Sequence, residues 1–181
     1  MTTRTQKMTL LGYAILGQLI DEPLTGYRIR KRFEATPLGH YSSSPGSIYP
    51  AIKKLDSMGL VAECSPDKGT SGKYALTTAG KDQLWEWFFS PADDLSHPKA
   101  SEALILRFAY MGNQVSKKDV LKFLSEWHRN LKNHLKSILI YRNATSQSKD
   151  LIQLLSVERG LMGYRTELRW LEKATKQLSQ H

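Results

Sequence analysis

Hydroxyl and ammonium groups, which bind base edges and phosphates in nucleic acids, occur together between residues 44 and 54. The hydroxyls belong to Ser44, Ser47 and Tyr49, and the ammonium groups to Lys53 and Lys54. Early residues of a recognition helix meet base edges in the major groove of DNA, and lysines farther along can reach the phosphodiester backbone. Without the surrounding motif, a solvated helix face would be the preferred interpretation of the two lysines.

The segment that carries these groups is predicted to be a helix. Its apolar residues recur at helical spacing and form one face: Ile48, Ile52 and Leu55. Gly59 suits the C-terminal cap, because glycine adopts the left-handed conformation that ends many helices. Pro50 is tolerated if the helix begins near Ser47, since the first N–H groups of a helix have no acceptor within it. The sequence leaves open whether Ser44 or Ser47 is the N-cap.

A second group of cations lies on the preceding predicted helix. Thr25 is expected to cap a helix over about residues 26–35, with its hydroxyl accepting a hydrogen bond from an early N–H. Tyr27 and Phe33 are expected near the core. Four cations are available to the surroundings: Arg28, Arg30, Lys31 and Arg32. Over residues 25–54 the chain has six basic side chains against a single acid, which is the electrostatic footprint of a polyanion-binding surface.

The chain before these segments predicts a first helix. The apolar run at residues 8–20 has helical spacing, as in an amphipathic core helix. Two basic residues precede the run, as in a secretory leader. Asp21 and Glu22 follow it and no Ala-x-Ala cleavage pattern is present, so we interpret it as a helix of the folded domain.

A hairpin and a further helix are predicted to follow. Residues 60–64 and 73–76 are prone to form strands and flank a turn-rich loop, the pattern of a β-hairpin. Thr77 can then cap a helix that carries Leu84, Trp85 and Phe88. Helix, helix, helix, hairpin and helix, within about the first 89 residues, is the order of a winged helix-turn-helix. Two cations of the wing are candidate DNA contacts: Lys68 and Lys73.

Prolines and acidic residues at 90–98 predict a linker between a winged helix domain at 1–89 and a helical domain at 99–181. The second domain has three segments of helical pattern, at about 99–112, 117–142 and 149–178. The fold class is therefore mainly α with a small β-hairpin.

The last helical segment has a regular apolar seam. Its main members are Leu154, Leu161, Tyr164, Leu168 and Leu171. A repeat near 3.5 residues marks helices that pack along their length. The seam fits either a helical hairpin within one chain or assembly across a homodimer. We favour the homodimer, because a hairpin alone would have little to cover its remaining face, and we predict that these five residues lie in the dimer interface.

Trp127 and Trp170 allow two interpretations. Aromatic pairs in a helical dimer can line an apolar cavity for a small-molecule effector. They more often contribute to ordinary packing, and packing is the interpretation that we favour.

Composition limits the function further. The chain has 26 basic and 17 acidic side chains, a formal net charge of +9, which is typical of proteins with a polyanionic partner. The net charge is +3 over residues 1–89 and +6 beyond them, so DNA binding by the first half leaves the larger excess unexplained. A single cysteine, Cys64, excludes a disulfide framework or a Cys-based zinc site and fits a reducing cytoplasm.

Catalytic and membrane patterns are missing from the sequence. The five histidines show no metal-binding spacing, and no glycine-rich loop precedes a Lys-Ser or Lys-Thr pair. We therefore predict no enzyme activity, metal site or cofactor. No apolar run reaches the 18 residues of a membrane span.

Several blocks of residues resemble the PadR-like family of bacterial transcriptional regulators. They are Leu24-Thr25-Gly26-Tyr27, Gly46-Ser47-Ile48-Tyr49-Pro50-Ala51-Ile52-Lys53-Lys54-Leu55, Gly59-Leu60-Val61 and Tyr74-Ala75-Leu76-Thr77-Thr78-Ala79-Gly80. The second half is similar to the virulence-activator type of C-terminal domain in Glu158-Arg159-Gly160-Leu161 and Leu168-Arg169-Trp170-Leu171-Glu172. The wing is less basic than is usual in the family.

The resemblance implies a winged helix, a homodimer and control of transcription at a palindromic operator in double-stranded DNA. We expect a repressor of the target promoter. The alternative is an interaction adaptor whose winged helix binds protein. The cations of the predicted recognition helix argue against it, because a protein-binding face should be more apolar.

Overall fold

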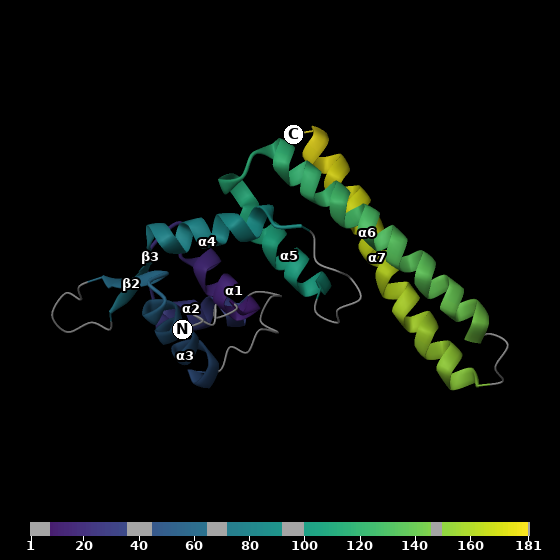
Figure 1. Cartoon of the computed structure of the whole chain (residues 1–181), viewed down its shortest axis with the longest axis horizontal. Coiled ribbons are helices and arrows are strands. Elements are labelled where there is room, and N and C mark those ends of the chain that lie inside the picture. Colours follow the sequence, from purple (N-terminus) through teal and green to yellow (C-terminus); the bar gives the residue numbers. More distant parts are fainter. Residues whose placement is uncertain (1–7, 36–44, 65–71, 92–99, 146–149, 181) are drawn as a thin grey trace, which may run out of the picture. The chain divides into compact units, whose positions relative to one another are not determined.

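The computed structural model describes residues 8–35, 45–64, 72–91, 100–145 and 150–180. Its elements are, in chain order, α1 (Leu10–Gln18), β1 (Leu24–Thr25), α2 (Gly26–Ala35), α3 (Pro45–Ser57), β2 (Val61–Cys64), β3 (Lys73–Leu76), α4 (Thr78–Phe89), α5 (Ala100–Met111), the 3-10 turn η2 (Gly112–Gln114), α6 (Lys117–Thr145) and α7 (Leu151–Gln180) (Figure 1). The chain divides into two compact units between Ser90 and Pro91, and each is described by itself.

The first unit contains a three-stranded antiparallel sheet in the order β1-β3-β2. Leu24 pairs with Tyr74 and Val61 with Leu76, which places β3 in the middle. The predicted hairpin is confirmed, and its second strand has the predicted bounds. The sequence missed β1, because two residues are too few to show the alternation that marks a strand.

Helix α1 confirms the predicted first helix, but it is buried on almost every side, so the predicted amphipathic character was wrong. Ala14, Ile15 and Leu16 are consecutive, and none has any exposed surface. Consecutive residues point in different directions around a helix, so α1 must be covered from several sides. It packs against both α3 and α4, which explains why its residues show little polar-apolar periodicity.

Helix α2 begins where its cap predicts. The Arg28 N–H donates to Thr25 Oγ1 at 3.2 Å, which confirms Thr25 as the capping residue. Phe33 is buried as expected, but Tyr27 is 54% exposed, so its predicted place near the core was wrong. The buried face of α2 is set by Gly26, Ile29 and Phe33, and Tyr27 projects away from that face.

Helix α3 begins at Pro45, earlier than the predicted start near Ser47. Ser47 therefore lies inside the helix and is not its N-cap, whereas Ser44 lies outside the described residues. Pro50 also lies inside the helix, where it has no N–H to donate to the carbonyl one turn earlier. Burial of Ile48, Ile52 and Leu55 confirms the predicted apolar face.

Gly59 ends α3 as predicted. Its φ is +70°, in the left-handed region that favours glycine. The Gly59 N–H donates to the Asp56 carbonyl at 2.8 Å, and the Leu60 N–H donates to the Leu55 carbonyl at 2.9 Å. This pair of hydrogen bonds is the Schellman motif, which satisfies carbonyls at the helix end and turns the chain directly into β2.

Helix α4 closes the core of the first unit. The Gly80 N–H donates to Thr77 Oγ1 at 3.0 Å, so the predicted cap is confirmed. Leu84 and Phe88 are buried as expected. The sequence did not single out Trp87, whose ring stacks on Tyr13 of α1 with 4.4 Å between centroids. This stacked pair joins α1 and α4.

In the second unit, α6 and α7 form a long antiparallel hairpin within one chain (Figure 1). Leu131 of α6 and Leu161 and Leu171 of α7 are buried. His134 and Tyr164 meet across the hairpin at 3.3 Å, and Arg142 Nη2 donates to Glu158 Oε1 at 3.1 Å. The apolar seam of α7 thus packs against α6 of the same chain, which is the hairpin alternative that the sequence left open. Among the described helices, none is long and apolar enough to cross a membrane.

Candidate nucleic-acid interface

The α2–α3 pair positions most of the predicted DNA contacts. The two helices approach closely where Gly26 meets Tyr49: a Cβ atom at Gly26 would lie 2.6 Å from Tyr49 Cε1. A side chain at position 26 would therefore push the Tyr49 ring away. Tyr49 is still 43% exposed, so its ring both supports the helix pair and presents an edge to solvent. Ser47 is half-buried at the start of the same helix.

The cations of α3 and β3 are available for an anionic partner. Lys53 and Lys73 are exposed, and Lys54 is half-buried. Within the described part of the chain, no ion pair involves any of these three lysines. Lys54 helps to line an apolar cavity of about 260 Å³ between α1 and α3, together with Met8 and Met58. The prediction that Lys54 lies opposite the apolar face of α3 therefore holds only in part.

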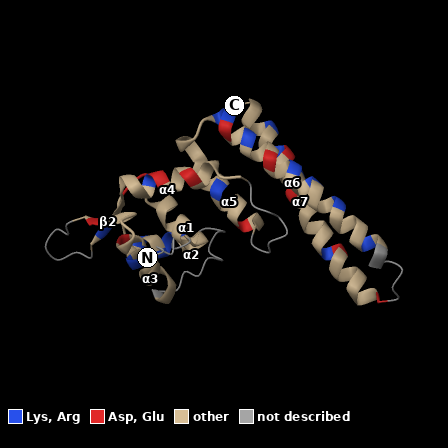
Figure 2. Cartoon of the chain, in the orientation of Figure 1, with Lys and Arg blue, Asp and Glu red and all other residues tan. Residues whose placement is uncertain are grey.

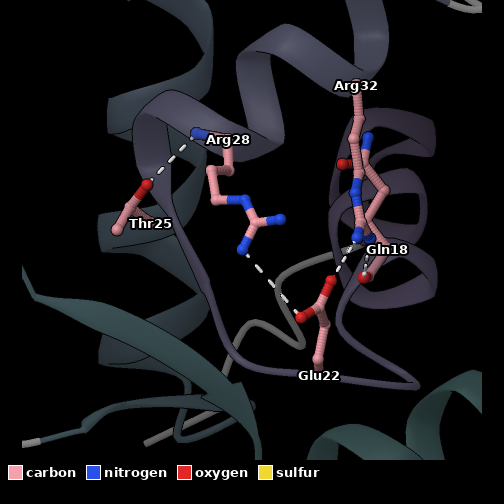
Figure 3. Close-up of polar contacts among 5 residues, drawn as sticks. All are labelled: Gln18, Glu22, Thr25, Arg28 and Arg32. Carbon is pink, nitrogen blue, oxygen red and sulfur yellow. Dashed lines mark hydrogen bonds and ion pairs between the residues drawn. The ribbon is translucent and has the colours of Figure 1, made fainter.

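The cations of α2 are paired with acids. Glu22 contacts both Arg28 and Arg32, as Figure 3 shows. The Arg28 Nη1 to Glu22 Oε2 distance is 4.0 Å, and the contact between Arg32 Nη2 and Glu22 Oε1 is much closer. Arg32 Nη1 also donates to the Gln18 carbonyl at 3.2 Å, which ties α2 to the end of α1.

Glu34 pairs with the two other cations of α2. Its carboxylate lies 2.8 Å from Lys31 Nζ and 3.7 Å from Arg30 Nε. The hydrogen bond from Lys31 holds the pKa of Glu34 below its ordinary value, and the same bond raises the pKa of Lys31. Both cations also lie over the exposed Tyr27 ring, at 5.4 Å for Arg30 and 5.9 Å for Lys31.

The wing is only partly described. Its exposed Lys73 begins β3, and Lys68 lies outside the described residues. Tyr74, the next residue of β3, is partly buried. Burial, with Glu63 and Asp56 nearby, raises the pKa of its phenol above the ordinary value.

The candidate effector residues lie inside a packed aromatic cluster of the second unit. Trp127 is 1% exposed and lies 5.4 Å from Trp170 between ring centroids. Trp127 Nε1 donates to Glu167 Oε1 at 2.8 Å, and Ser101 Oγ donates to the other carboxylate oxygen at 3.0 Å. Burial raises the pKa of Glu167 above its ordinary value. A role of the two tryptophans in effector binding stays a prediction.

Basic side chains of the second unit are distributed along its helices. Lys and Arg recur along α6 rather than gathering at one end (Figure 2). Within the described ranges, no three His, Cys, Asp or Glu side chains come together as metal ligands.

Three helices followed by a hairpin, with a third short strand beside it and α4 closing the core, define a winged helix-turn-helix protein. The Transcriptional regulator PadR-like family matches residues 15–86, and the Virulence activator alpha C-term family matches residues 102–179. The chain belongs to the PadR-like family of transcriptional regulators, with a C-terminal domain of the virulence-activator type. The predicted fold class is confirmed.

One curated relative is similar to part of the chain. The Negative transcriptional regulator PadR of Bacillus subtilis is 36% identical over 83 residues, which are 44% of this chain and 46% of that protein. The chain thus aligns with about half the length of this curated relative. Membership of a family of transcriptional regulators agrees with the prediction that the chain is not an enzyme.

Solved structures resemble the chain at lower similarity. Bacillus subtilis PadR in complex with operator DNA is 25% identical, covers 95% of this chain and 99% of its own, and has a TM-score of 0.45. The same regulator in complex with p-coumaric acid is also 25% identical. It covers 94% of this chain and 99% of its own, with a TM-score of 0.45. The virulence activator AphA of Vibrio cholerae is 21% identical, covers 93% of this chain and 98% of its own, and has a TM-score of 0.40.

Proposed function

We propose that this chain is a sequence-specific DNA-binding regulator that acts as a homodimer and represses its target promoter. The observation that carries the proposal is the surface of α3, where Ser47, Tyr49 and an exposed Lys53 that has no ion pair among the described residues accompany a buried apolar face. Repression is supported by the relative from Bacillus subtilis, which is a negative regulator.

In this proposal α3 enters the major groove and α2 crosses the phosphate backbone. Ser47 and Tyr49 of α3 read base edges, together with Ser44, which precedes the helix. Lys53 and Lys54 contact phosphates without reading sequence. Thr25 and Arg28 meet the backbone at the start of α2, where the helix N-terminus itself favours an anion. Lys68 and Lys73 add backbone contacts from the wing.

The proposed homodimer is supported by apolar side chains that the second unit leaves exposed. Near the α6–α7 turn and along the outer side of α7, these are Ile140, Tyr141, Leu151, Ile152, Leu155 and Met162. Their exposed fractions range from 53% for Leu155 to 79% for Ile152. An apolar surface of this kind is typical of an interface between subunits. We name these six residues the hairpin face.

A mobility-shift titration on DNA from upstream of the chain's own gene, set against random duplex of equal length, tests the proposed function. Binding to the upstream DNA at concentrations that leave random duplex free would support it. Equal binding to both, or none, would contradict it.

Substitutions in α3 should separate phosphate contacts from base contacts. Lys53→Ala is expected to weaken binding to specific and random DNA about equally, because a phosphate contact carries no sequence information. Ser47→Ala is expected to lower discrimination by about 1–3 kcal/mol for each base edge that it no longer binds, with little loss of general affinity. Parallel titrations of the two DNAs measure both effects, and unchanged binding in both variants would contradict the placement of α3. Tyr49→Ala is expected to act like Ser47→Ala, although its ring also supports α2 at Gly26.

The seam of α7 and the hairpin face should respond differently to polar substitution. Leu161→Asn removes a side chain that is 1% exposed within one chain, so it is expected to cost about 2–5 kcal/mol of folding free energy. Ile152→Asn alters a side chain that is 79% exposed, so it is expected to leave the fold stable and release monomers. Thermal unfolding and sedimentation measure the two effects. A folded monomer from Leu161→Asn would instead support a dimer interface formed by the seam itself, at Leu154, Leu161, Tyr164, Leu168 and Leu171.

A further inference from the structure

Two cations of α2 that lie four residues apart, Arg28 and Arg32, share one acid. Glu22 lies in the turn between α1 and β1, outside the helix, yet its carboxylate contacts Arg28 and Arg32 together (Figure 3). Neither cation could be assigned this partner from helix spacing, because Glu22 is not on α2. The turn therefore brings a negative charge to a surface that the sequence predicts to be basic.

The two contacts of Glu22 are unequal. Arg32 is held firmly, by one Glu22 oxygen and by the Gln18 carbonyl. Arg28 is held loosely, at 4.0 Å from the other oxygen, and its side chain remains 55% exposed. A pair with this separation and exposure adds little to stability, since solvent screens it. Arg32 thus fixes the carboxylate in place, and Arg28 is the cation free to turn to another anion.

Arg28 also lies where a phosphate is expected. It is in the first turn of α2, next to the Thr25 cap, and the first helix of a helix-turn-helix crosses the DNA backbone. An anion at this end is favoured by the free N–H groups and by the helix dipole. Glu22 supplies an anion of the chain's own beside the Arg28 side chain.

We propose that Glu22 is a built-in brake on DNA affinity: its fixed carboxylate competes with backbone phosphate for Arg28 and repels that phosphate. The inference rests on the proposed function, because it requires α2 to lie on DNA. The brake acts on any sequence, since it opposes a phosphate contact. It therefore lowers general affinity and leaves the discrimination between operator and random DNA unchanged.

Glu22→Gln in the full-length chain tests the brake. The variant is expected to bind both operator and random duplex more tightly, by about threefold per protomer and about tenfold per dimer at low salt, on the scale of one exposed ion pair. The slope of log affinity against log salt is expected to steepen by about 0.9 for each additional phosphate that the variant neutralises. The ratio of operator to random affinity should stay constant.

Three matched variants show whether the tighter binding passes through Arg28. Glu86→Gln removes the same charge from an exposed site on α4, and Glu22→Asp keeps the charge on a shorter side chain; both should stay within about twofold of the wild type. In the Arg28→Ala background, adding Glu22→Gln should raise affinity by much less than about tenfold over Arg28→Ala alone. Thermal unfolding checks the fold of each variant, and a loss of stability cannot imitate tighter binding.

Two results would overturn the brake. One is that Glu22→Gln is folded by its melting curve but binds no more tightly than the wild type. The other is that Glu22→Gln increases affinity to the same extent when Arg28 is replaced by alanine. In either case, salt-dependent binding of the wild type would leave the proposed function standing. A wild type that does not bind duplex DNA would instead overturn the proposed function, and the brake with it.

Discussion

Binding of the dimer to its operator is expected to weaken by about 10³–10⁵ when salt rises from about 50 to about 200 mM, if it neutralises about 6–10 phosphates. Cations that bind phosphates displace condensed counterions, and salt opposes that release. Each protomer offers exposed Arg28, Lys53 and Lys73 in the described part of its winged helix, and half-buried Lys54. Two protomers together supply enough cations for this range.

Titrations at four or more salt concentrations measure the slope. Lys53→Ala should lower its magnitude by about 0.9 for each phosphate that the variant no longer neutralises, which makes this variant a control for the origin of the salt effect. A nearly flat response would favour the alternative of a winged helix that binds protein.

A fragment that ends at Pro91 is expected to fold as a monomer and to bind the operator about 10²–10⁴-fold more weakly than the full-length chain. Buried residues such as Leu24, Phe33 and Phe88 give the first unit a core of its own. The weaker binding has a different cause. A two-fold dimer places two recognition helices one turn of DNA apart, so the first half-site contact raises the effective concentration of the second.

Sedimentation and operator titration of the fragment test this division of labour. Fluorescence of Trp85 and Trp87 reports whether the fragment is folded, because the two other tryptophans lie beyond residue 91. A folded fragment that binds the operator as tightly as the full-length chain would show that the second unit contributes nothing to binding. Because Ile152→Asn disrupts the hairpin face, this full-length variant should bind the operator with an affinity close to that of the fragment.

The sequence predicted those parts of the fold that depend on local signals. Thr25 and Thr77 cap their helices, Gly59 ends α3, and β3 has the predicted bounds, because each depends on the chemistry of a few neighbouring residues. Features that depend on packing between elements, or on very short elements, were harder to predict. The burial of α1 from several sides removed its periodicity, and β1 is too short to show any.

The candidate site was predicted as a set of residues but not as an electrostatic surface. Glu22 precedes the basic stretch at residues 25–54 in the sequence, yet in the structure its carboxylate contacts Arg28 and Arg32. Within its described residues, the structure thereby separates paired cations on α2 from unpaired ones on α3 and β3. The seam of α7 had a similar limit: its repeat indicates helix packing, but no repeat can tell whether the partner helix belongs to the same chain.

The most direct test of a sequence-specific regulator is the ratio of two dissociation constants at one fixed salt concentration. One is for the chain's own upstream region, and the other is for random duplex of the same length and composition. For the full-length protein we expect random DNA to bind at least about 10³-fold more weakly, the lower end for specific regulators. A ratio near one would contradict sequence-specific regulation by this chain.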